Sequence, residues 1–583
     1  MAAKRKRIPY GMMNFVDVIG DNCYYVDKTR FIEKIENANR FFFFIRPRRF
    51  GKSLTISMLH HYYNILEADS FEKLYGELYI GKHPTPERSS YLIIYLNFAV
   101  VNAEINNYRS SLDGHCNTAF EIFCDIYKKY IPQYVKDGVI ARKDKGAVEQ
   151  LDYLYRECAK AGVNIYLFID EYDHFTNKIL SEPECLDEYK SETHGTGYLR
   201  NFFDTVKAGT YSSIKRVFVT GVSPVTMDDL TSGFNIGTNY SMSEEFNEMT
   251  GFTEEEVRAM LDYYATTCEF HHTTDQLIEL MKPWYDNYCF AKGSYGRTTM
   301  YNSCMVLYFI DQYINFNHCD IPDDMIEDNI RVDYNKLRML IRKDKEFAHD
   351  ASIIQSLVEN GFITGELKKG FPAESIANPD NFISLLYYFG MLTIDGTYRG
   401  NTKLSIPNQV VRDQIYSYLL ANYNDVGLEQ DSYEKRKMET DMAYDGNFKP
   451  FFGYIEECLQ RYASQRDKQK GEAFVHGFTL AMTAQNKFYR PVSEKDTQAG
   501  YADLFLHPLD QIYKDMEHSY IIELKYAKGR EPKERVEVLK KEGIAQAYRY
   551  ADTETVKNAI GKTKLHKIVV VYHGMDMAVC EEI

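Results

Sequence analysis

Short apolar runs alternate with longer helical patterns over the first 250 residues. The runs are rich in Phe, Ile, Val and Tyr and are separated by tens of residues. They are FFFFIR at 41–46, YLIIYLNFA at 91–99, VNIYLFID at 163–170 and IKRVFVTGV at 214–222. Strands with this spacing need crossover connections, so the pattern predicts an α/β domain with a buried parallel sheet.

From Gly251 to about residue 425 the pattern becomes helical. Thr253 and Glu256 have the spacing of a capping box in front of an apolar-periodic run. Farther on, ISLLYYFGMLTI and KLSIPNQVVRDQIYSYLL predict the order helix, strand, turn, strand, helix. That order would suit a winged-helix-like module.

A polar, charge-mixed segment at 422–447 is the best candidate for a linker or linker helix. Helical patterns follow it, and then apolar strands at 501–507, 519–526 and 567–573. We therefore expect three domains: an α/β domain with a parallel sheet at 1–250, a helical, winged-helix-like domain at 251–425, and a small α/β domain at 448–583.

Composition and charge narrow the class of protein. Of the 583 residues, 44% are hydrophobic and 26% are charged, as in globular proteins. The net charge of −15 excludes a strongly basic nucleic-acid protein, although not a local basic groove. No apolar run reaches 18 residues, and the eleven cysteines form no CxxC pair. We expect a cytoplasmic protein with no membrane partner.

The apolar strand at 41–46 leads into a candidate phosphate-binding loop. The pattern G-x-x-x-x-G-K-[ST] aligns with Arg46, Pro47, Arg48, Arg49, Phe50, Gly51, Lys52 and Ser53, and Leu54 follows in the helix. Lys52 would reach the β- and γ-phosphates of ATP, and Ser53 would ligate Mg²⁺. Arg46 replaces the first glycine, and a chance GKS tripeptide is the alternative. Arg48 and Arg49 could contact phosphate or a partner, or be solvated.

A second apolar strand ends on Asp170 and Glu171, which is the form of a Walker B motif. Asp170 would hold Mg²⁺ through water, and Glu171 would act as the general base on the attacking water. Alternatively, acidic residues at a strand end cap the next helix. Both motifs together, in this order, predict an ATP-binding fold.

A third strand ends near Thr220. In the additional-strand class of P-loop ATPases, a polar residue at this strand end senses the γ-phosphate, and Thr220 is our candidate. The alternative is a threonine whose hydroxyl is satisfied within a turn. Arg200 is a candidate arginine finger.

The last domain has the residue layout of the PD-(D/E)xK nucleases. Asp503 starts one strand, and Glu523 and Lys525 lie two residues apart on the next, so they project from the same face. The two carboxylates would gather Mg²⁺, and the lysine would stabilise charge on the scissile phosphate. Because E-x-K is common on exposed strands, a non-catalytic pair is the alternative.

Other residues extend this set. Gln546 and Tyr550 are four residues apart on one helix face, an accessory pattern in one branch of these nucleases, and Gln546 joins the candidate catalytic residues. Glu472 could complete the metal site. The segment 525–541 has a local excess of positive charge for a phosphate backbone, although a solvated helix face explains it equally well.

Together these residues closely resemble a family of bacterial AAA-ATPase-like proteins with a C-terminal PD-(D/E)xK nuclease domain. The matching motifs are IPYGMMNF at 8–15, YVDKT at 25–29, RPRRFGKSL at 46–54, FIDEYD at 168–173, VTGVSPV at 219–225, WYDNYCF at 284–290, YN at 301–302, IPN at 406–408, YADLFL at 501–506 and IIELKY at 521–526. The loop without its first glycine looks like that family's own version. Tyr501 departs from the Arg that relatives often carry, and an insert lengthens the connection between Asp503 and Glu523.

The resemblance implies an AAA-like P-loop NTPase of the additional-strand class, joined to a restriction-endonuclease-like α/β domain. We expect ATP and Mg²⁺ as cofactors, and ATP hydrolysis coupled to Mg²⁺-dependent cleavage of nucleic acid, with DNA preferred to RNA as the partner. One alternative is a signalling or scaffolding NTPase switch whose C-terminal domain is non-catalytic. Another is an oligomeric remodelling ATPase, and a homo-oligomer is compatible with each hypothesis.

Overall fold

The computed structural model describes residues 5–102, 105–174, 197–225, 236–327, 353–424, 433–462, 471–492 and 504–583. The chain divides into two compact units: the first is Met1–Asp320 with Thr364–Asn408, and the second is Ile321–Ile363 with Gln409–Ile583. Within the described ranges, no helix is long and apolar enough to cross a membrane. The three domain boundaries expected from the sequence stay predictions.

A five-stranded parallel sheet forms the centre of the first unit. Its order is β2 (Leu92–Asn97), β3 (Ile165–Asp170), β4 (Ile214–Gly221), β1 (Phe41–Ile45) and β5 (Thr238–Asn239). The four apolar runs of the sequence are the four longer strands, so the predicted parallel sheet is confirmed. β4 lies between β1 and β3, which makes it the additional strand between the two motif-bearing strands.

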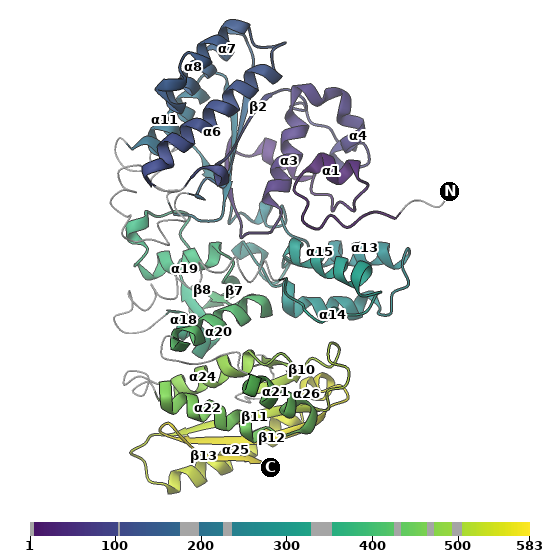
Figure 1. Cartoon of the computed structure of the whole chain (residues 1–583), viewed down its shortest axis with the longest axis vertical. Helices are drawn as coiled ribbons and strands as arrows, with labels where there is room; N and C mark the ends of the chain where they lie inside the picture. Colours follow the sequence, from purple (N-terminus) through teal and green to yellow (C-terminus); the bar gives the residue numbers. More distant parts are fainter. Residues whose placement is uncertain are drawn as a thin grey trace. The chain divides into compact units, whose positions relative to one another are not determined.

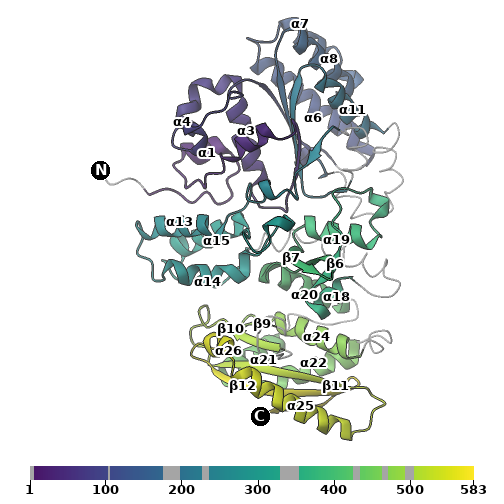
Figure 2. The same ribbon diagram turned by 180° about the vertical axis from the view of Figure 1, so that it is seen from behind.

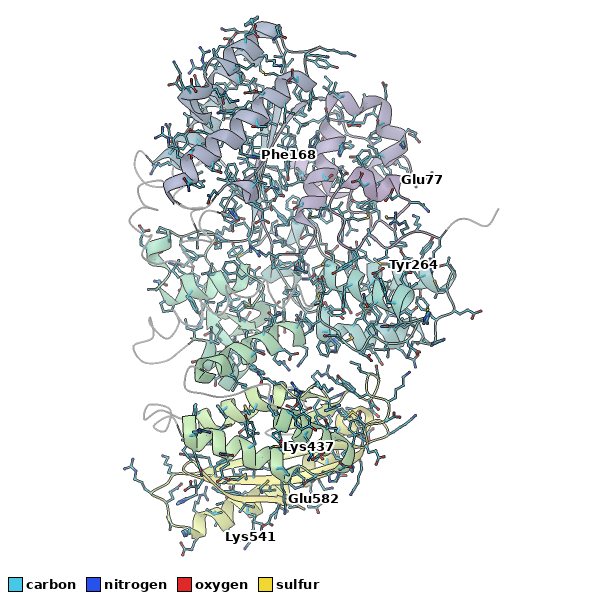
Figure 3. All side chains as sticks on the ribbon, viewed as in Figure 1. Glu77, Phe168, Tyr264, Lys437, Lys541 and Glu582 are labelled. Atoms are coloured by element: carbon cyan, nitrogen blue, oxygen red, sulfur yellow. The ribbon has the colours of Figure 1, made fainter. Side chains whose placement is uncertain are left out.

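Aromatic side chains fill one side of this sheet. Phe42 of β1 stacks on Phe218 of β4 at a ring distance of 5.3 Å, and Tyr166 stacks on Phe168 of β3 at 4.3 Å. Phe168, labelled in Figure 3, is fully buried. These residues belong to a core cluster shared with the helices around Phe15 and with α3, so the aromatic-rich strands serve packing.

Helices cover both faces of the sheet, as Figure 1 shows. On the side of that aromatic cluster are α1 (Phe15–Gly20), α2 (Phe31–Asn37), α3 (Lys52–Tyr63), α4 (Phe71–Tyr75) and α5 (Tyr79–Lys82). On the other side are α6 (Ile105–Ile126), α7 (Gln133–Ile140), α8 (Ala147–Lys160) and α11 (Tyr198–Thr210). Two covered faces explain why β3 is buried along its whole length.

The helices α13 (Glu254–Ala265), α14 (Thr274–Tyr285) and α15 (Ser303–Asp311) follow the sheet in the chain. The predicted capping box at the start of α13 is confirmed, because the Thr253 hydroxyl accepts the Glu256 N–H and Glu256 accepts the Thr253 N–H. Thr273 and Gln276 form a second capping box on α14. The pair of caps fixes where both helices begin.

A small three-stranded sheet has the order β6 (Ile363–Gly365), β8 (Asn401–Ser405) and β7 (Thr393–Tyr398). Along the chain, α18 (Ile353–Asn360) precedes β6, α19 (Pro379–Tyr388) precedes β7, and α20 (Gln409–Asn424) follows β8. The predicted order helix, strand, turn, strand, helix is therefore present. A winged-helix-like role for it stays a prediction.

The second unit contains a mixed five-stranded sheet. Its order is β13 (Asp576–Glu582), β12 (Lys564–His573), β11 (His518–Ala527), β10 (Leu504–Pro508) and β9 (Tyr489–Val492). β11 and β12 are parallel, and the other neighbours are antiparallel. β11 is thus the central strand. Its residues 519–524 and 527 are buried, and His518 is half-buried.

Helices lie on both faces of this second sheet (Figure 2). One face is covered by α25 (Glu534–Ala551) and α26 (Glu554–Ala559), whose apolar residues pack with Ile521 and Ala527 of β11. The other face has α21 (Tyr433–Asp445), α22 (Lys449–Tyr462) and α24 (Glu472–Ala484). The hydroxyl of Tyr520 donates to the Met442 carbonyl of α21 at 2.6 Å. Alternate residues of β11 therefore face different helices.

Half-buried and buried histidines predict a loss of protein stability in mild acid. Burial lowers the pKa of His60 and of His507 to about 4, and it also lowers the pKa of His566. Because an unfolded histidine titrates near 6.5, the unfolded chain binds more protons than the folded chain below that pH. Stability is therefore complete above pH 6.5 and falls as the pH drops toward 4.

The test compares urea-unfolding midpoints between pH 7.5 and 5.5. Between pH 7.5 and 5.5 the free energy of unfolding should fall by about 1 kcal/mol less in His60→Gln, and likewise in His507→Gln, than in the wild type. An identical pH dependence in the wild type and both variants would contradict this account.

Candidate functional sites

The phosphate-binding loop occupies the turn between β1 and α3. Gly51, which precedes the helix, has φ of +87°, in the left-handed region where glycine has no steric cost. The Lys52 ammonium donates to the Arg46 carbonyl at 3.1 Å and to the Pro47 carbonyl at 3.0 Å. The loop is thus wrapped around the lysine, at the amino end of a helix, as a P-loop requires.

Lys52 is buried inside this loop, and only 6% of its surface is exposed. Burial lowers the pKa of the ammonium, while the carboxylates of Glu171, Asp170 and Asp173 oppose that shift, in this order. The three acidic residues come from the end of β3 and the turn after it. The structure therefore brings the Walker B segment to the P-loop lysine.

Arg46, in the place of the first glycine, has a structural contact. Its guanidinium donates to the carbonyls of Ser241 (2.5 Å) and Phe246 (3.0 Å) and lies 4.2 and 4.3 Å from the rings of Phe44 and Phe290. Burial lowers its pKa to about 10. The side chain anchors the loop to the body of the first unit, and the predicted nucleotide contact of Arg46 stays a prediction.

Residues that follow position 250 in the sequence pack against the P-loop. The Phe50 ring packs edge-on against Tyr288 and Phe290, and its carbonyl accepts the Gly251 N–H at 3.0 Å. A Cβ on Gly390 would lie 2.9 Å from Pro47. The sequence did not predict this packing, although Tyr288 and Phe290 belong to the WYDNYCF motif.

The neighbouring Arg49 has φ of +67°, and its carbonyl accepts the Ser303 hydroxyl at 3.2 Å and the Cys304 N–H at 3.4 Å. Arg48 is half-buried, and Leu54 packs at the edge of the aromatic core. Arg46, Arg49 and Phe50 of the predicted loop are thus each held by hydrogen bonds to other segments. Its role in binding nucleotide stays a prediction.

Ser53 and Asp170 meet at the edge of the sheet. The Ser53 hydroxyl donates to Asp170 Oδ2 at 3.0 Å, the Glu171 N–H donates to Asp170 Oδ1 at 3.0 Å, and the Tyr95 hydroxyl approaches Oδ2 at 3.4 Å. Burial, and then the Glu171 carboxylate, raises the pKa of Asp170. Sequence reasoning missed Tyr95, which lies on the adjacent strand β2.

This pair has the chemistry of a magnesium site. Hydroxyl and carboxylate oxygens are the ligands that Mg²⁺ prefers, and a cation would favour the ionised form of a carboxylate whose pKa is raised by burial. Ser53 and Asp170 are therefore the residues that would hold the ion. Among the described residues, no cluster of three His, Cys, Asp or Glu side chains forms a metal site.

Glu171 has φ of +52°, which is unusual for a residue with a side chain. Of all the groups near Lys52, its carboxylate does most to oppose the lowering of the lysine pKa. The predicted general base thus shares the site with the P-loop lysine. Its catalytic role stays a prediction.

The hydroxyl of Thr220 contacts the backbone of β1. Thr220 is fully buried and donates to the Phe44 carbonyl at 2.5 Å. This is the contact expected of a satisfied threonine, and the γ-phosphate sensor role stays a prediction. Arg200 is half-buried in the first turn of α11, and its finger role also stays a prediction.

In the second unit, the E-x-K pair lies on the central strand. Glu523 is fully buried, and the Lys525 ammonium is 3.1 Å from its Oε2. The expectation that both side chains project from one face is confirmed. That face is the one covered by α25.

Gly543 lets α25 approach this pair closely. A Cβ at Gly543 would lie 3.1 Å from Val569 Cγ1 and 3.6 Å from both Glu523 Cβ and Lys525 Cγ. Gln546, three residues on, is half-buried, and Tyr550 packs on Phe505. Gln546 therefore shares the helix face that covers the E-x-K strand. Sequence reasoning missed Gly543, whose signal is a glycine inside a helical pattern.

The other predicted ligands are placed differently. Asp503 lies outside the described residues, as does the neighbouring Tyr501. The residue after Asp503, Leu504, pairs with Ile522, the residue before Glu523.

Glu472 is exposed at the start of α24. After burial, its carboxylate is the largest cause that raises the pKa of Tyr526. Because Tyr526 alternates with Lys525 on β11, Glu472 belongs to the helix on the opposite face from α25.

Comparisons with known proteins match the two parts of the chain that contain these residues. Residues 9–231 match the family model described as a predicted AAA-ATPase, and residues 470–582 match the PD-(D/E)XK nuclease superfamily. The protein has an AAA-ATPase-like domain and a C-terminal nuclease-superfamily domain. The first match contains the P-loop and the Asp170–Glu171 pair, and the second contains Glu523 and Lys525.

One curated relative, an uncharacterized protein in the vnfD 5′ region of Azotobacter chroococcum mcd 1, is 25% identical over 269 residues. The match spans 44% of this chain and 45% of the relative, so less than half of the relative's length is covered.

Two solved structures share some similarity with the chain. The Walker-type ATPase PABY2304 of Pyrococcus abyssi is 12% identical, with a TM-score of 0.37 over 67% of this chain and 94% of that one. The Aeropyrum pernix ORC2 protein, in ADPNP–ADP complexes, is 10% identical, with a TM-score of 0.28 over 67% and 93%. These scores are low, and the fold rests on strand order and the family matches.

Two helix glycines of the second unit give a matched stability test. A Cβ added at Gly453 of α22 would meet open space. A Cβ added at Gly543, in the nuclease-superfamily domain, would lie 3.1 Å from Val569 Cγ1. Gly453→Ala should raise the free energy of unfolding by about 0.5–1 kcal/mol, because alanine favours the helix more than glycine does. In Gly543→Ala, the crowding of the new methyl group against Val569 should cancel this increase. Urea unfolding should therefore rank Gly543→Ala below Gly453→Ala by about 1 kcal/mol. Equal stabilities would contradict the close packing of α25.

Proposed function

We propose that the AAA-ATPase-like domain binds and hydrolyses ATP with Mg²⁺. The observation that carries this proposal is the 3.0 Å hydrogen bond between Ser53 and Asp170, which joins the P-loop to the Walker B strand. Lys52 would bind the β- and γ-phosphates in place of the loop carbonyls that it contacts now. Mg²⁺ held by Ser53 and Asp170 would neutralise phosphate charge.

Glu171 is the proposed general base. It would accept a proton from the attacking water, while the Lys52 ammonium stabilises the charge that develops on the phosphate oxygens. The backbone N–H groups at the start of α3 would complete the phosphate cradle. We also propose that Thr220 lies within reach of the γ-phosphate region through its place at the end of β4.

We further propose that the nuclease-superfamily domain cleaves nucleic acid, DNA rather than RNA, with Mg²⁺. Glu523 offers carboxylate oxygens at a buried position, and Lys525 would stabilise charge on the scissile phosphate. Asp503 and Gln546 are the remaining proposed members of the site, and Glu472, on the helix of the opposite sheet face, is left out of it. We also propose a cytoplasmic location, and a homo-oligomer is a further hypothesis.

An exposed basic segment follows the E-x-K strand directly. Lys528, Arg530 and Lys533 are exposed after β11 ends at Ala527. On α25, Lys541, labelled in Figure 3, is also exposed. These cations support a local contact with a phosphate backbone on a chain whose net charge is −15.

Two substitutions separate ATP binding from hydrolysis. Lys52→Ala removes the phosphate ligand and should weaken ATP binding by about tenfold or more. Glu171→Gln keeps the shape of the side chain and should retain affinity within about threefold while phosphate release falls about 100-fold. Filter binding of labelled ATP and a phosphate-release assay measure the two effects.

The exposed Lys145, paired with Glu149 on the surface, supplies the control, because Lys145→Ala should change neither quantity. Unchanged phosphate release in Glu171→Gln would remove the general-base assignment. Unchanged binding in Lys52→Ala would remove the P-loop assignment.

For the nuclease site, Lys525→Ala and Glu523→Gln should each lower Mg²⁺-dependent cleavage of labelled DNA by about 100-fold. Asp503→Ala should have the same effect, and a chelator should abolish cleavage. RNA of the same sequence serves as the second substrate. Lys557→Ala, which removes a surface partner of Asp552 outside the basic segment, is the matched lysine control and should cleave normally.

Cleavage that survives in Lys525→Ala and Asp503→Ala would contradict the nuclease assignment. If the wild-type chain hydrolyses ATP but cleaves neither DNA nor RNA, the result favours an NTPase switch with a non-catalytic C-terminal domain.

A further inference from the structure

Asp173 lies two residues beyond Glu171 and is fully buried. Its Oδ1 accepts the Val222 N–H at 3.2 Å, and its Oδ2 accepts the Ser223 N–H at 2.7 Å. Each carboxylate oxygen thus binds a backbone donor of the turn that follows β4. Hydrogen bonds to a charged acceptor are about twice as strong as neutral ones, so this is a firm attachment between two loops.

Tyr172 makes a second attachment to the same turn. Its N–H donates to the Thr220 carbonyl at 3.2 Å, and its hydroxyl donates to the Ser223 carbonyl at 2.5 Å. The two residues that follow Glu171 are therefore both bound to the end of β4.

Gly221 makes this approach sterically feasible. A Cβ at Gly221 would lie 2.3 Å from Asp173 Oδ1 and 2.7 Å from Tyr172 Cδ1, closer than real Cβ contacts. Any other residue would push the Asp173 carboxylate from its donors. The glycine of the VTGVSPV motif thus serves the close approach of the Walker B turn.

These attachments follow a residue with an unfavourable backbone conformation. The left-handed φ of Glu171 costs about 1–2 kcal/mol in a residue with a Cβ, and it persists only where neighbouring contacts hold it. The Glu171 N–H is bound by Asp170, and its carbonyl accepts the His174 N–H at 3.0 Å. The bonds of Tyr172 and Asp173 fix the direction in which the chain leaves Glu171.

The end of β4 also supports the P-loop. The Gly221 carbonyl accepts the Arg46 N–H at 3.3 Å, and the Thr220 hydroxyl donates to the Phe44 carbonyl. The end of β4 and the turn after it are therefore bonded to Arg46, the first residue of the P-loop, and to the Walker B turn. A shift of this turn would change the position of Glu171 relative to the loop.

We infer that Asp173 is a positioning residue that holds Glu171 in its left-handed conformation and aims its carboxylate at the water that attacks ATP. The inference rests on the proposed ATPase function. Asp173 acts on Glu171 through the backbone of Tyr172, which lies between them. Its loss should therefore affect the chemical step more than ATP binding.

The test is steady-state ATP hydrolysis by the full chain carrying Asp173→Asn. An asparagine offers one acceptor oxygen to two N–H donors and turns its own NH₂ toward one of them. We expect kcat to fall at least about tenfold, with KM for ATP within about threefold of the wild type.

Asp27→Asn is the matched control. The Asp27 carboxylate also accepts two backbone N–H groups, from Thr29 at 2.9 Å and Tyr79 at 2.7 Å, in the same unit. Asp27→Asn should lower the melting temperature and leave kcat within about threefold.

Gly221→Ala tests the same contact from the other side, because its methyl displaces the Asp173 carboxylate. It should reproduce the fall in kcat, and the double variant should fall less than the product of the two single effects. Tyr172→Phe removes only one hydroxyl, and it gives a smaller fall in kcat in a protein that keeps its wild-type circular dichroism.

The outcomes separate the two levels of the proposal. Wild-type kcat in Asp173→Asn or Tyr172→Phe, or effects that multiply fully in the double variant, would overturn the positioning role while leaving the ATPase assignment intact. An equal fall in kcat in Asp27→Asn would also overturn it. A wild-type chain without ATP hydrolysis would overturn both.

Discussion

The hydrogen bond between Ser53 and Asp170 joins segments that are 117 residues apart in the sequence. It forms because β1 and β3 both pair with β4 in parallel, so their carboxyl ends reach the same edge of the sheet. Each strand then delivers two chemical groups to that edge: an ammonium and a hydroxyl directly after β1, and two carboxylates at the end of β3. A change in strand order or register would separate these groups, so the parallel pairing is the constraint on which the proposed ATP site depends.

Strained backbone at this edge is accompanied by strong attachments. Arg49 and Glu171 both have left-handed φ values, one in the P-loop and one in the Walker B turn. Hydrogen bonds from Ser303 and Cys304 hold the carbonyl of Arg49, and the end of β4 holds the residues after Glu171. The buried Arg46 guanidinium adds a third anchor. Such strain is expected where side chains must be presented in one orientation before a ligand arrives.

Local patterns in the sequence predicted the long strands, the capping box at Thr253, the strand–loop–helix around Lys52 and the shared face of Glu523 and Lys525. They could not predict contacts between distant segments. The two-residue strand β5 has too little apolar pattern to identify. The contacts of Arg46, the close approach of Gly543 and the opposite face of Glu472 each depend on which elements pack together, which composition and spacing do not encode. The structure leaves Asp503 outside its described residues, so that member of the nuclease set still rests on the sequence.

Calorimetric titration of ATP into the full chain, with Mg²⁺ and with a chelator, tests the Ser53–Asp170 site most directly when Ser53→Ala is compared with the wild type. The account predicts that Mg²⁺ strengthens ATP binding by the wild type by about tenfold or more, and that Ser53→Ala loses most of this gain while still binding ATP through Lys52. Equal ATP affinity of the wild type with and without Mg²⁺, or the full gain in Ser53→Ala, would contradict it.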